Sequence, residues 1–344
     1  MFFFHVKCPS EARRLLDRPV PHPAVERVPL AAARGRVAAR TIAAPHDLPE
    51  FDRAVVDGYA VRAGDTFGAS PGLPAYLNIA GEVLMGQGTG LCLAAGQAVR
   101  IATGGMLPQG ADAVVMIEYT ERLAEGMIEV TRPAAPGEHL VRRGDDIRAG
   151  EPLILAGRRL RPHDLGALAG LGIVEIEVFA RPRVALLPTG DEIVPPEATP
   201  GPGQVRDVNT TALAAAVGAA GGVPVCLPIV PDEPERLREA LAAALAASDL
   251  VLISGGSSVG ARDGTLDALL SFPDSELLLH GIAIRPGKPV IAVRIGERLL
   301  FGLPGNPVSA LIVFDQFVRP HLRRLGGEGC SGVQVFRCSG RTIR

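Results

Sequence analysis

The chain has 344 residues, a formal net charge of −2 at pH 7 and 47% hydrophobic residues. This length predicts more than one domain, and the balanced charge excludes the strongly basic surface typical of nucleic-acid-binding proteins. The apolar runs are too short for a membrane helix, and the start, MFFFHVKCPSEARR, lacks the apolar length of a signal peptide, so we expect a cytoplasmic protein that binds neither nucleic acid nor membrane.

The first 177 residues predict two kinds of structure. Residues 1–45 and 147–177 contain helix-like segments, such as AVERVPLAAARGRVAART and RPHDLGALAGLG, which we expect to pack together as a split, elongated linker domain. Residues 46–146 instead contain short apolar segments separated by glycine and proline, as in GEVLMGQGTG. That pattern predicts a β-rich domain inserted into the linker.

From about residue 178 the pattern changes to alternating strands and helices. Strands are predicted at 183–188, 223–230, 249–254, around Ile282, and at 290–293 and 299–304, with helices at 209–222, 232–248, 265–270 and 307–325. Asn209 is expected to cap the first of these helices. The succession is typical of an α/β domain with an open, largely parallel sheet covered on both faces, which we assign to residues 178–325.

Three polar loops follow strands of this α/β domain: PTGDE at 188, SGGSS at 254 and LPGNP at 303. In open parallel sheets, ligands bind beyond the carboxyl ends of the strands. Small residues such as Gly255 and Ser258 let backbone N–H groups and hydroxyls face a phosphate, although a strand-to-helix turn without a ligand is the alternative. No GxSxG elbow surrounds the serines, so we interpret them as binding groups and not as nucleophiles.

The spacing of the cysteines and histidines and the small number of lysines limit the kinds of site that the chain can form. The five cysteines form no CxxC pair and the seven histidines form no HxxxH or HExxH pair, so a zinc site or disulfide framework is not indicated. The chain has 33 arginines and only two lysines, Lys7 and Lys288. Lys288 lies within RPGKP, where a compact ammonium could contact phosphate or another oxyanion, the alternative being a solvated turn lysine.

Seven motifs, in this order along the chain, resemble those of the MoeA family of molybdopterin molybdenumtransferases, which includes the C-terminal domain of gephyrin. They are AVVDGYAVRAGD, ATGGMLPQGADAVVMIE, RRGDDIRAGE, PTGDEI, SGGSSVGARD, IRPGKP and GLPGNPVSAL. The resemblance covers about residues 10–325. It implies a cytosolic transferase of molybdenum cofactor biosynthesis that takes adenylylated molybdopterin and molybdate as substrates, uses Mg²⁺ and releases AMP.

The resemblance also implies roles for individual residues. The catalytic carboxylates and Mg²⁺ ligands would be Asp57, Asp146, Glu192 and Asp263. Asp232 is a weaker fifth, because it precedes a predicted helix and could instead cap it. Lys288 would be a catalytic cation, and the substrate-binding groups would be Thr103, Gly255, Gly256, Ser257, Ser258, Arg285, Pro304, Gly305, Asn306 and Pro307.

Two features depart from the family pattern. Arg285 stands where the family usually has lysine, which keeps the charge but changes the geometry. The family normally adds a small C-terminal β domain, whereas this chain stops after GVQVFRCSGRTIR. We therefore interpret residues 326–344 as a remnant of that domain and expect some oxyanion contacts to be missing.

The distribution of the motifs between the predicted domains predicts a homodimer. Asp57 and Thr103 belong to the predicted β-rich insertion, whereas Glu192 and Lys288 belong to the α/β domain, with the split linker between them. We expect a homodimer whose sites are shared between subunits, as the resemblance also implies, and a molybdopterin adenylyltransferase as substrate donor. The alternatives are a non-catalytic scaffold of the same family, or the adenylyltransferase itself, which lacks the VVDGYAV and RRGDDI modules.

Overall fold

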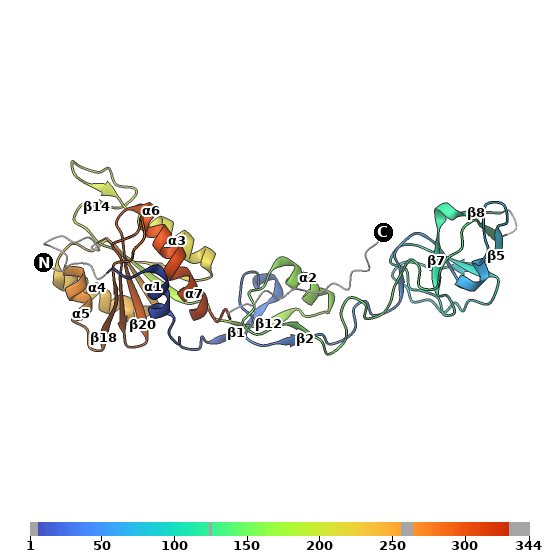
Figure 1. The fold of residues 1–344 in the computed structure, drawn as a ribbon, viewed down its shortest axis with the longest axis horizontal. Coiled ribbons are helices and arrows are strands. Elements are labelled where there is room, and N and C mark those ends of the chain that lie inside the picture. Colours follow the sequence, from blue (N-terminus) through green and yellow to red (C-terminus); the bar gives the residue numbers. More distant parts are fainter. Residues whose placement is uncertain (1–5, 124–125, 256–263, 330–344) are drawn as a thin grey trace. The chain divides into compact units, whose positions relative to one another are not determined.

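The computed structural model describes residues 6–123, 126–255 and 264–329, and these form two compact units (Figure 1). The α/β unit comprises the chain up to residue 40, residues 155–166 and the chain from 173 on. The β unit comprises residues 41–154 and 167–172.

A six-stranded mixed sheet forms the centre of the α/β unit. Its strands, in spatial order, are β16 (Val223–Cys226), β13 (Arg183–Pro188), β17 (Leu250–Ser254), β20 (Arg298–Leu303), β19 (Ile291–Ile295) and β18 (Ser275–His280). The first four are parallel, whereas β19 and β18 continue the sheet in antiparallel pairings. The expected largely parallel sheet is confirmed, with an antiparallel edge added to it.

Helices cover both faces of this sheet (Figure 1). One face carries α1 (Pro9–Leu16), α3 (Asn209–Ala220), α6 (Pro307–Val313), the π-helical turn η4 (Phe314–Val318) and α7 (Arg319–Leu325). The other carries α4 (Pro234–Ala247) and α5 (Gly264–Leu270). Side chains of β17 alternate between the two cores, Leu250 and Leu252 in the first and Val251 and Ile253 in the second. Burial on both sides explains why this strand is continuously apolar.

Four local predictions in the α/β unit were wrong. The segment AVERVPLAAARGRVAART forms no α-helix; it forms β1 (Val25–Pro29), paired antiparallel with β12 (Glu175–Phe179), and then a 3₁₀ turn, η1 (Leu30–Ala32). The two strands lie about 150 positions apart in the sequence, and their pairing supplies the backbone hydrogen bonds that a helix would otherwise provide. Strand β16 ends at Cys226 and not at 230, because Pro228 has no N–H for a ladder. Ile282 lies outside the strands and forms only an isolated bridge with Lys7.

The fourth wrong prediction concerns the start of α3. Asn209 does not cap the helix; its Nδ2 donates to Gly305 O at 2.9 Å. Asp207 Oδ1 instead accepts a hydrogen bond from Thr210 N at 3.0 Å, so the carboxylate before the helix takes the capping role. The predicted end was right, because Gly221 has the left-handed conformation that a helix C-terminus favours.

The β unit contains a second six-stranded sheet. Its strands, in spatial order, are β7 (Ala113–Met116), β4 (Gly58–Val61), β6 (Gln97–Ile101), β5 (Ala75–Glu82), β9 (Met127–Val130) and β8 (Thr120–Arg122). All pairings are antiparallel except that of β5 with β6. A Cβ on Gly58 would lie 1.9 Å from Val115 O, so only glycine lets β4 approach β7 this closely.

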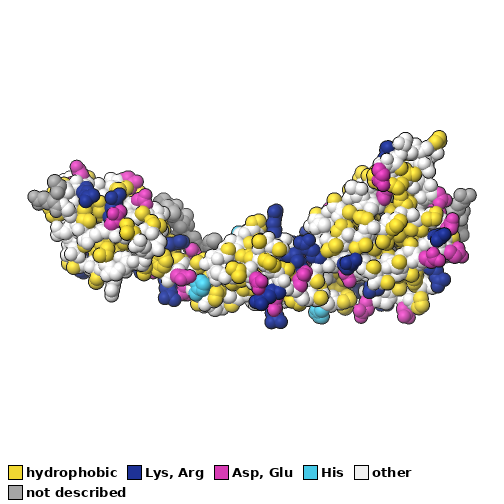
Figure 2. All heavy atoms as spheres, turned by 180° about the vertical axis from the view of Figure 1, so that it is seen from behind, with side chains coloured by type: hydrophobic (Ala, Val, Ile, Leu, Met, Phe, Trp, Pro, Cys, Tyr) yellow, Lys and Arg dark blue, Asp and Glu magenta, His cyan; other side chains and the backbone are white. Residues whose placement is uncertain are grey.

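Short elements complete the two units. They are β2 (Ile42–Ala43), β3 (Arg53–Ala54), η2 (Ala63–Thr66), η3 (Ile117–Tyr119), β10 (Leu140–Val141), β11 (Pro152–Ile154), α2 (Pro162–Gly170), β14 (Ile193–Val194) and β15 (Val205–Arg206). In the described part of the chain, none of the helices combines the length and the apolar character that crossing a bilayer requires. On the face shown in Figure 2, basic side chains lie interspersed with acidic ones.

Candidate functional site

The three polar loops of the α/β unit leave the same edge of its sheet. Pro188 at the end of β13 lies opposite Ser254 at the end of β17, and Ser254 lies opposite Leu303 at the end of β20. Parallel pairing in this register brings the starts of PTGDE, SGGSS and LPGNP side by side. Gly255 is the only described member of the predicted glycine-serine cradle, since Gly256, Ser257, Ser258 and Asp263 lie outside the described residues.

The turn at Gly255 packs tightly against Thr189. Gly255 has φ +111°, and a Cβ there would lie 2.4 Å from Thr189 O and 2.9 Å from Thr189 Oγ1. Thr189 N donates to Ser254 O at 3.0 Å, which holds the two loop starts together. Thr189 is buried, and its Oγ1 has no hydrogen-bond partner among the described residues. Sequence reasoning missed this hydroxyl, which lies at the edge with its oxygen unpaired within the described part of the chain.

Three carboxylates gather beside this edge. Asp191 Oδ1 accepts a hydrogen bond from Asp232 N at 3.1 Å. The pKa of Asp232 is raised by burial and then by the negative charges of Asp191 and Glu192. A Cβ on Gly190 would lie 2.7 Å from Glu192 Oε2, so the Glu192 side chain folds back over that glycine. We call Asp191, Glu192 and Asp232 the acidic group.

The acidic group decides whether Asp232 caps a helix, and it adds Asp191 to the candidate site. Asp232 does not cap α4, whose N-cap is Glu233 without a side-chain hydrogen bond. Asp191 was missed by sequence reasoning, although its position beside Glu192 in PTGDE was a usable signal, because two adjacent carboxylates in one turn repel each other unless they share a partner.

The predicted cations lie on a turn that is fixed to the same unit. Arg285 and Lys288 are exposed, whereas Gly287 between them is buried with φ +111°. A Cβ on Gly287 would lie 2.9 Å from both Ile284 Cδ1 and Val313 Cγ2. The turn is therefore packed against α6 at its glycine, and both charged side chains are left at the surface.

The LPGNP loop joins the starts of two helices. Asn306 caps α6, since its Oδ1 accepts from Ser309 N at 3.2 Å, and Pro307 is the first helical residue. Gly305 O accepts from Asn209 at the start of α3. Pro304 is buried beneath them. These contacts give the loop a structural role, whatever it binds.

The β unit holds the other predicted residues. Asp57 Oδ1 accepts from Thr103 N at 2.7 Å and from Thr103 Oγ1 at 2.8 Å, so the structure joins two residues 46 positions apart. These hydrogen bonds from the Thr103 backbone and side chain lower the pKa of Asp57 below its ordinary value. Asp146 is held separately, with its Oδ2 3.7 Å from a guanidinium nitrogen of Arg53, a cation that sequence reasoning did not select.

We expect Thr103→Val to raise the pKa of Asp57, because the variant removes the side-chain hydrogen bond and keeps the backbone one. Because the pKa of Asp57 is lower in the folded protein than in the unfolded chain, this contact stabilises the fold at pH values above the pKa of the unfolded chain. The stabilisation is lost as the pH falls through the pKa of the folded protein. NMR titration of the Asp57 carboxyl carbon measures the change. Thr131→Val, which removes only a bond to Tyr119 O, is the control, and an unchanged titration in Thr103→Val would contradict the assignment.

Among the side chains that the structure describes, no three histidines, cysteines, aspartates or glutamates are arranged to hold a metal ion by themselves. The acidic group nevertheless has the chemistry that a hard cation prefers, since Mg²⁺ uses a few carboxylates together with water and phosphate oxygens. Burial, and after it the negative charges of Asp191 and Glu192, raise the pKa of Asp232, as is typical where carboxylates gather.

Comparison with known proteins gives two family matches that together cover most of the chain. Residues 9–172 match the MoeA N-terminal region (domain I and II), and residues 185–324 match the probable molybdopterin binding domain. The chain is 37% identical over 314 residues to the molybdopterin molybdenumtransferase of Nostoc sp., covering 90% of this chain and 72% of that protein. It is 38% identical over 304 residues to molybdopterin molybdenumtransferase 2 of Mycobacterium tuberculosis, covering 87% and 75%.

A solved structure shows the same fold. The crystal structure of the molybdopterin biosynthesis moea protein from Pyrococcus horikosii aligns with a TM-score of 0.76 and 40% sequence identity. The alignment covers 95% of this chain and 82% of that one.

Proposed function

This chain belongs to the MoeA family of molybdopterin molybdenumtransferases, and we propose that it inserts molybdenum from molybdate into adenylylated molybdopterin and releases AMP. The observation that carries the proposal is the sheet edge itself. There, parallel strand pairing brings the PTGDE turn, with its acidic group, beside the starts of SGGSS and LPGNP. Such an edge suits a substrate with a phosphate linkage and a divalent cation.

Mg²⁺ fits the residues at this edge. Glu192 and Asp263 of one subunit, the latter outside the described residues, with Asp57 and Asp146 of the other, would hold the ion. The cation would also offset the charges of Asp191 and Glu192, which after burial raise the pKa of Asp232. When bound, Mg²⁺ supplies charge neutralisation to the phosphate oxygens of the substrate.

The protein's own residues bind and orient the reactants. Arg285 and Lys288, exposed on their fixed turn, would contact the anionic oxygens of substrate and molybdate. Backbone N–H groups from Gly255, Gly256, Ser257 and Ser258 and from LPGNP would cradle the phosphates. Asp57, like any aspartate of ordinary pKa, is ionised at neutral pH, and the two hydrogen bonds from Thr103 hold its carboxylate in place and lower its pKa further, so it presents a fixed negative charge.

The proposal also covers the oligomeric state, the cellular location and the donor of the substrate. The split linker of residues 1–45 and 147–177 would carry the inserted domain 46–146 and the molybdopterin-binding domain 178–325 as separate parts. We propose a cytoplasmic homodimer in which the β unit of one subunit and the α/β unit of the other complete each site. A molybdopterin adenylyltransferase would hand over the substrate. The match over residues 9–172 argues against the chain being that adenylyltransferase itself.

The purified chain, given adenylylated molybdopterin, Mg²⁺ and molybdate, is expected to release AMP only when molybdate is present, and to yield a molybdenum-loaded pterin. AMP release by chromatography and molybdenum content by mass spectrometry measure the two products. Binding of the substrate without molybdate-dependent AMP release would instead favour the non-catalytic scaffold.

A further inference from the structure

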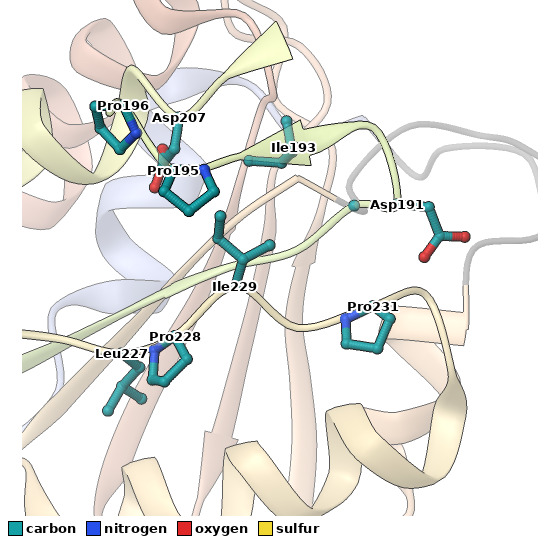
Figure 3. A pocket seen from close by; sticks show the side chains of 10 residues that line it. Asp191, Ile193, Pro195, Pro196, Asp207, Leu227, Pro228, Ile229 and Pro231 are labelled. Carbon is teal, nitrogen blue, oxygen red and sulfur yellow. The ribbon is translucent and has the colours of Figure 1, made fainter. Parts of the chain in front are cut away.

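A cavity of about 690 Å³ lies on the α/β unit between α1, η4 and α7. Its size falls in the range of small-molecule sites. It shares no lining residue with the cavity of about 600 Å³ beside the acidic group, which Asp191 and Asp207 line at the edge where the polar loops begin (Figure 3). The proposed function makes no use of the cavity between the helices.

This cavity lies toward the opposite edge of the sheet from the three polar loops. α6 begins at Pro307, directly after LPGNP, and η4 and α7 continue the same helix, so its last turn lies about 24 Å farther along the axis at the normal rise of a helix. The end of α7 packs at the start of β13, because a Cβ on Gly326 would lie 3.5 Å from Pro182 Cδ. α1 lies beside α7 on this face (Figure 1), and Arg324 Nη2 donates to Leu16 O at 2.7 Å. A ligand in this cavity would therefore lie away from the proposed substrate site.

Positive charge exceeds negative charge along the walls of the cavity, which we call the arginine groove. Five arginines but only three acidic residues line it. Each acidic residue pairs with an arginine of the same walls: Asp315 with Arg319, Glu328 with Arg323 and Asp17 with Arg324. Among the described residues, no ion pair involves the other two arginines, Arg13 and Arg14, which lie in the last turn of α1. The groove therefore has an excess of two positive charges, both on one helix turn.

Arg13 and Arg14 present donors that the fold itself does not use. Arg13 Nη2 donates to Gln316 Oε1 at 2.6 Å, and its guanidinium carbon lies 5.8 Å from the centre of the Phe317 ring, so the group is held at the groove wall. A guanidinium has five N–H donors, so most of those of Arg13 stay available. Arg14 is exposed. The end of α1 does not need either cation, because Arg324 already donates to its last carbonyl.

The floor of the groove is buried and uncharged. Leu16 is 3% exposed and Phe317 is 2% exposed. His321 is 5% exposed, and burial lowers its pKa to about 4, so its ring is neutral at neutral pH. Arg324 Nη2 can only donate, and it lies 3.4 Å from His321 Nδ1, so Nε2 carries the ring hydrogen and is a further donor. An apolar floor beneath cationic walls suits a compact carbon skeleton that bears anionic groups.

We propose that the arginine groove binds a small organic polyanion, whose phosphate or carboxylate groups pair with Arg13 and Arg14. Two guanidinium groups outside any ion pair match two negative charges, and the planar fork of each suits either oxyanion. Binding here needs neither Mg²⁺ nor the polar loops, so it can hold or fail independently of the proposed function.

Isothermal titration calorimetry in Mg²⁺-free buffer, with citrate and with fructose 1,6-bisphosphate as probes, tests the groove. We expect replacement of both Arg13 and Arg14 with glutamine to weaken binding about tenfold or more, since charge-assisted hydrogen bonds are lost. The melting temperature should stay the same, because both side chains are exposed. Tighter binding of the bisphosphate would identify a phosphate ligand, and tighter binding of citrate a carboxylate ligand. Failure of the wild type to bind either probe would overturn the inference.

Replacement of Arg236 and Arg238 with glutamine is the matched control. It removes the same charge from exposed positions of α4, on the other face of the same sheet, and should leave the affinity unchanged. Lys288→Ala should also bind the probes as the wild type does, since Lys288 belongs to the proposed substrate site. Equal weakening in the α4 control would reduce the effect to long-range charge, and loss of binding in Lys288→Ala would place the anion at the polar loops. Either result would defeat the assignment of the groove.

Gln316→Glu tests the groove without removing an arginine. Glutamate keeps the size of the side chain and the hydrogen bond from Arg13, but it places a negative charge where the anion would bind. Affinity for the probes should fall about tenfold or more, because like charges are brought together. Gln204→Glu is its control, since Gln204 is exposed and its Oε1 also accepts a hydrogen bond, from Gly201 N at 3.0 Å, outside the groove. Unchanged affinity in Gln316→Glu, or an equal loss in Gln204→Glu, would contradict binding at the groove.

Discussion

Replacing Glu192 with glutamine is expected to lower the rate of molybdenum insertion by about 100-fold or more while leaving the fold intact. Glu192 folds over Gly190 at the edge of the sheet and contributes to the negative charge around Asp232. The variant keeps the size of the side chain but removes the charge that a divalent cation and its phosphate ligand require. Molybdate-dependent AMP release measures the effect, and thermal denaturation verifies the fold.

Glu197→Gln is the control for this substitution, because Glu197 is exposed in the loop between β14 and β15 and lies outside the acidic group. In Glu192→Gln, the pKa of Asp232 should fall toward its ordinary value, since one of the charges that raise it is gone. The melting temperature should be unchanged or slightly higher, as active-site substitutions can produce. Full turnover in Glu192→Gln would show that the carboxylate is structural.

Mixing inactive Asp57→Ala and Lys288→Ala subunits is expected to restore about a quarter of wild-type activity. The two residues belong to different compact units, Asp57 to the β unit and Lys288 to the α/β unit. If each site takes one unit from each subunit, random exchange makes half of the dimers mixed, and every mixed dimer keeps one intact site of two. Activity of the mixture, with subunit exchange followed by differently tagged chains, measures this.

A mixture of Asp57→Ala and Thr103→Ala subunits is the matched control. The two side chains are hydrogen-bonded to each other within one β unit, so every mixed dimer would carry a defect at both sites. This mixture should remain inactive. Background activity in the Asp57→Ala and Lys288→Ala mixture, with exchange demonstrated, would mean that each site forms within a single chain.

The sequence by itself predicted the elements whose signals are local. The apolar run of β17, the glycine at the end of α3 and the alternation of strands and helices all depend on neighbouring residues, and these predictions are confirmed. The seven ordered motifs likewise identified the family, because each motif is contiguous and its order can be read without the fold.

Only the tertiary structure decided the features that depend on distant residues. The β1 segment looked helical until its pairing with β12 was known, and Asp57 meets Thr103 because β4 pairs with β6. Asp191 reaches Asp232 across 41 positions, and the cavity beside Asp207 forms only where two loops meet. Periodicity reports which face of an element is apolar, but it carries no information about which element covers that face, and long-range pairing determines where polar side chains meet.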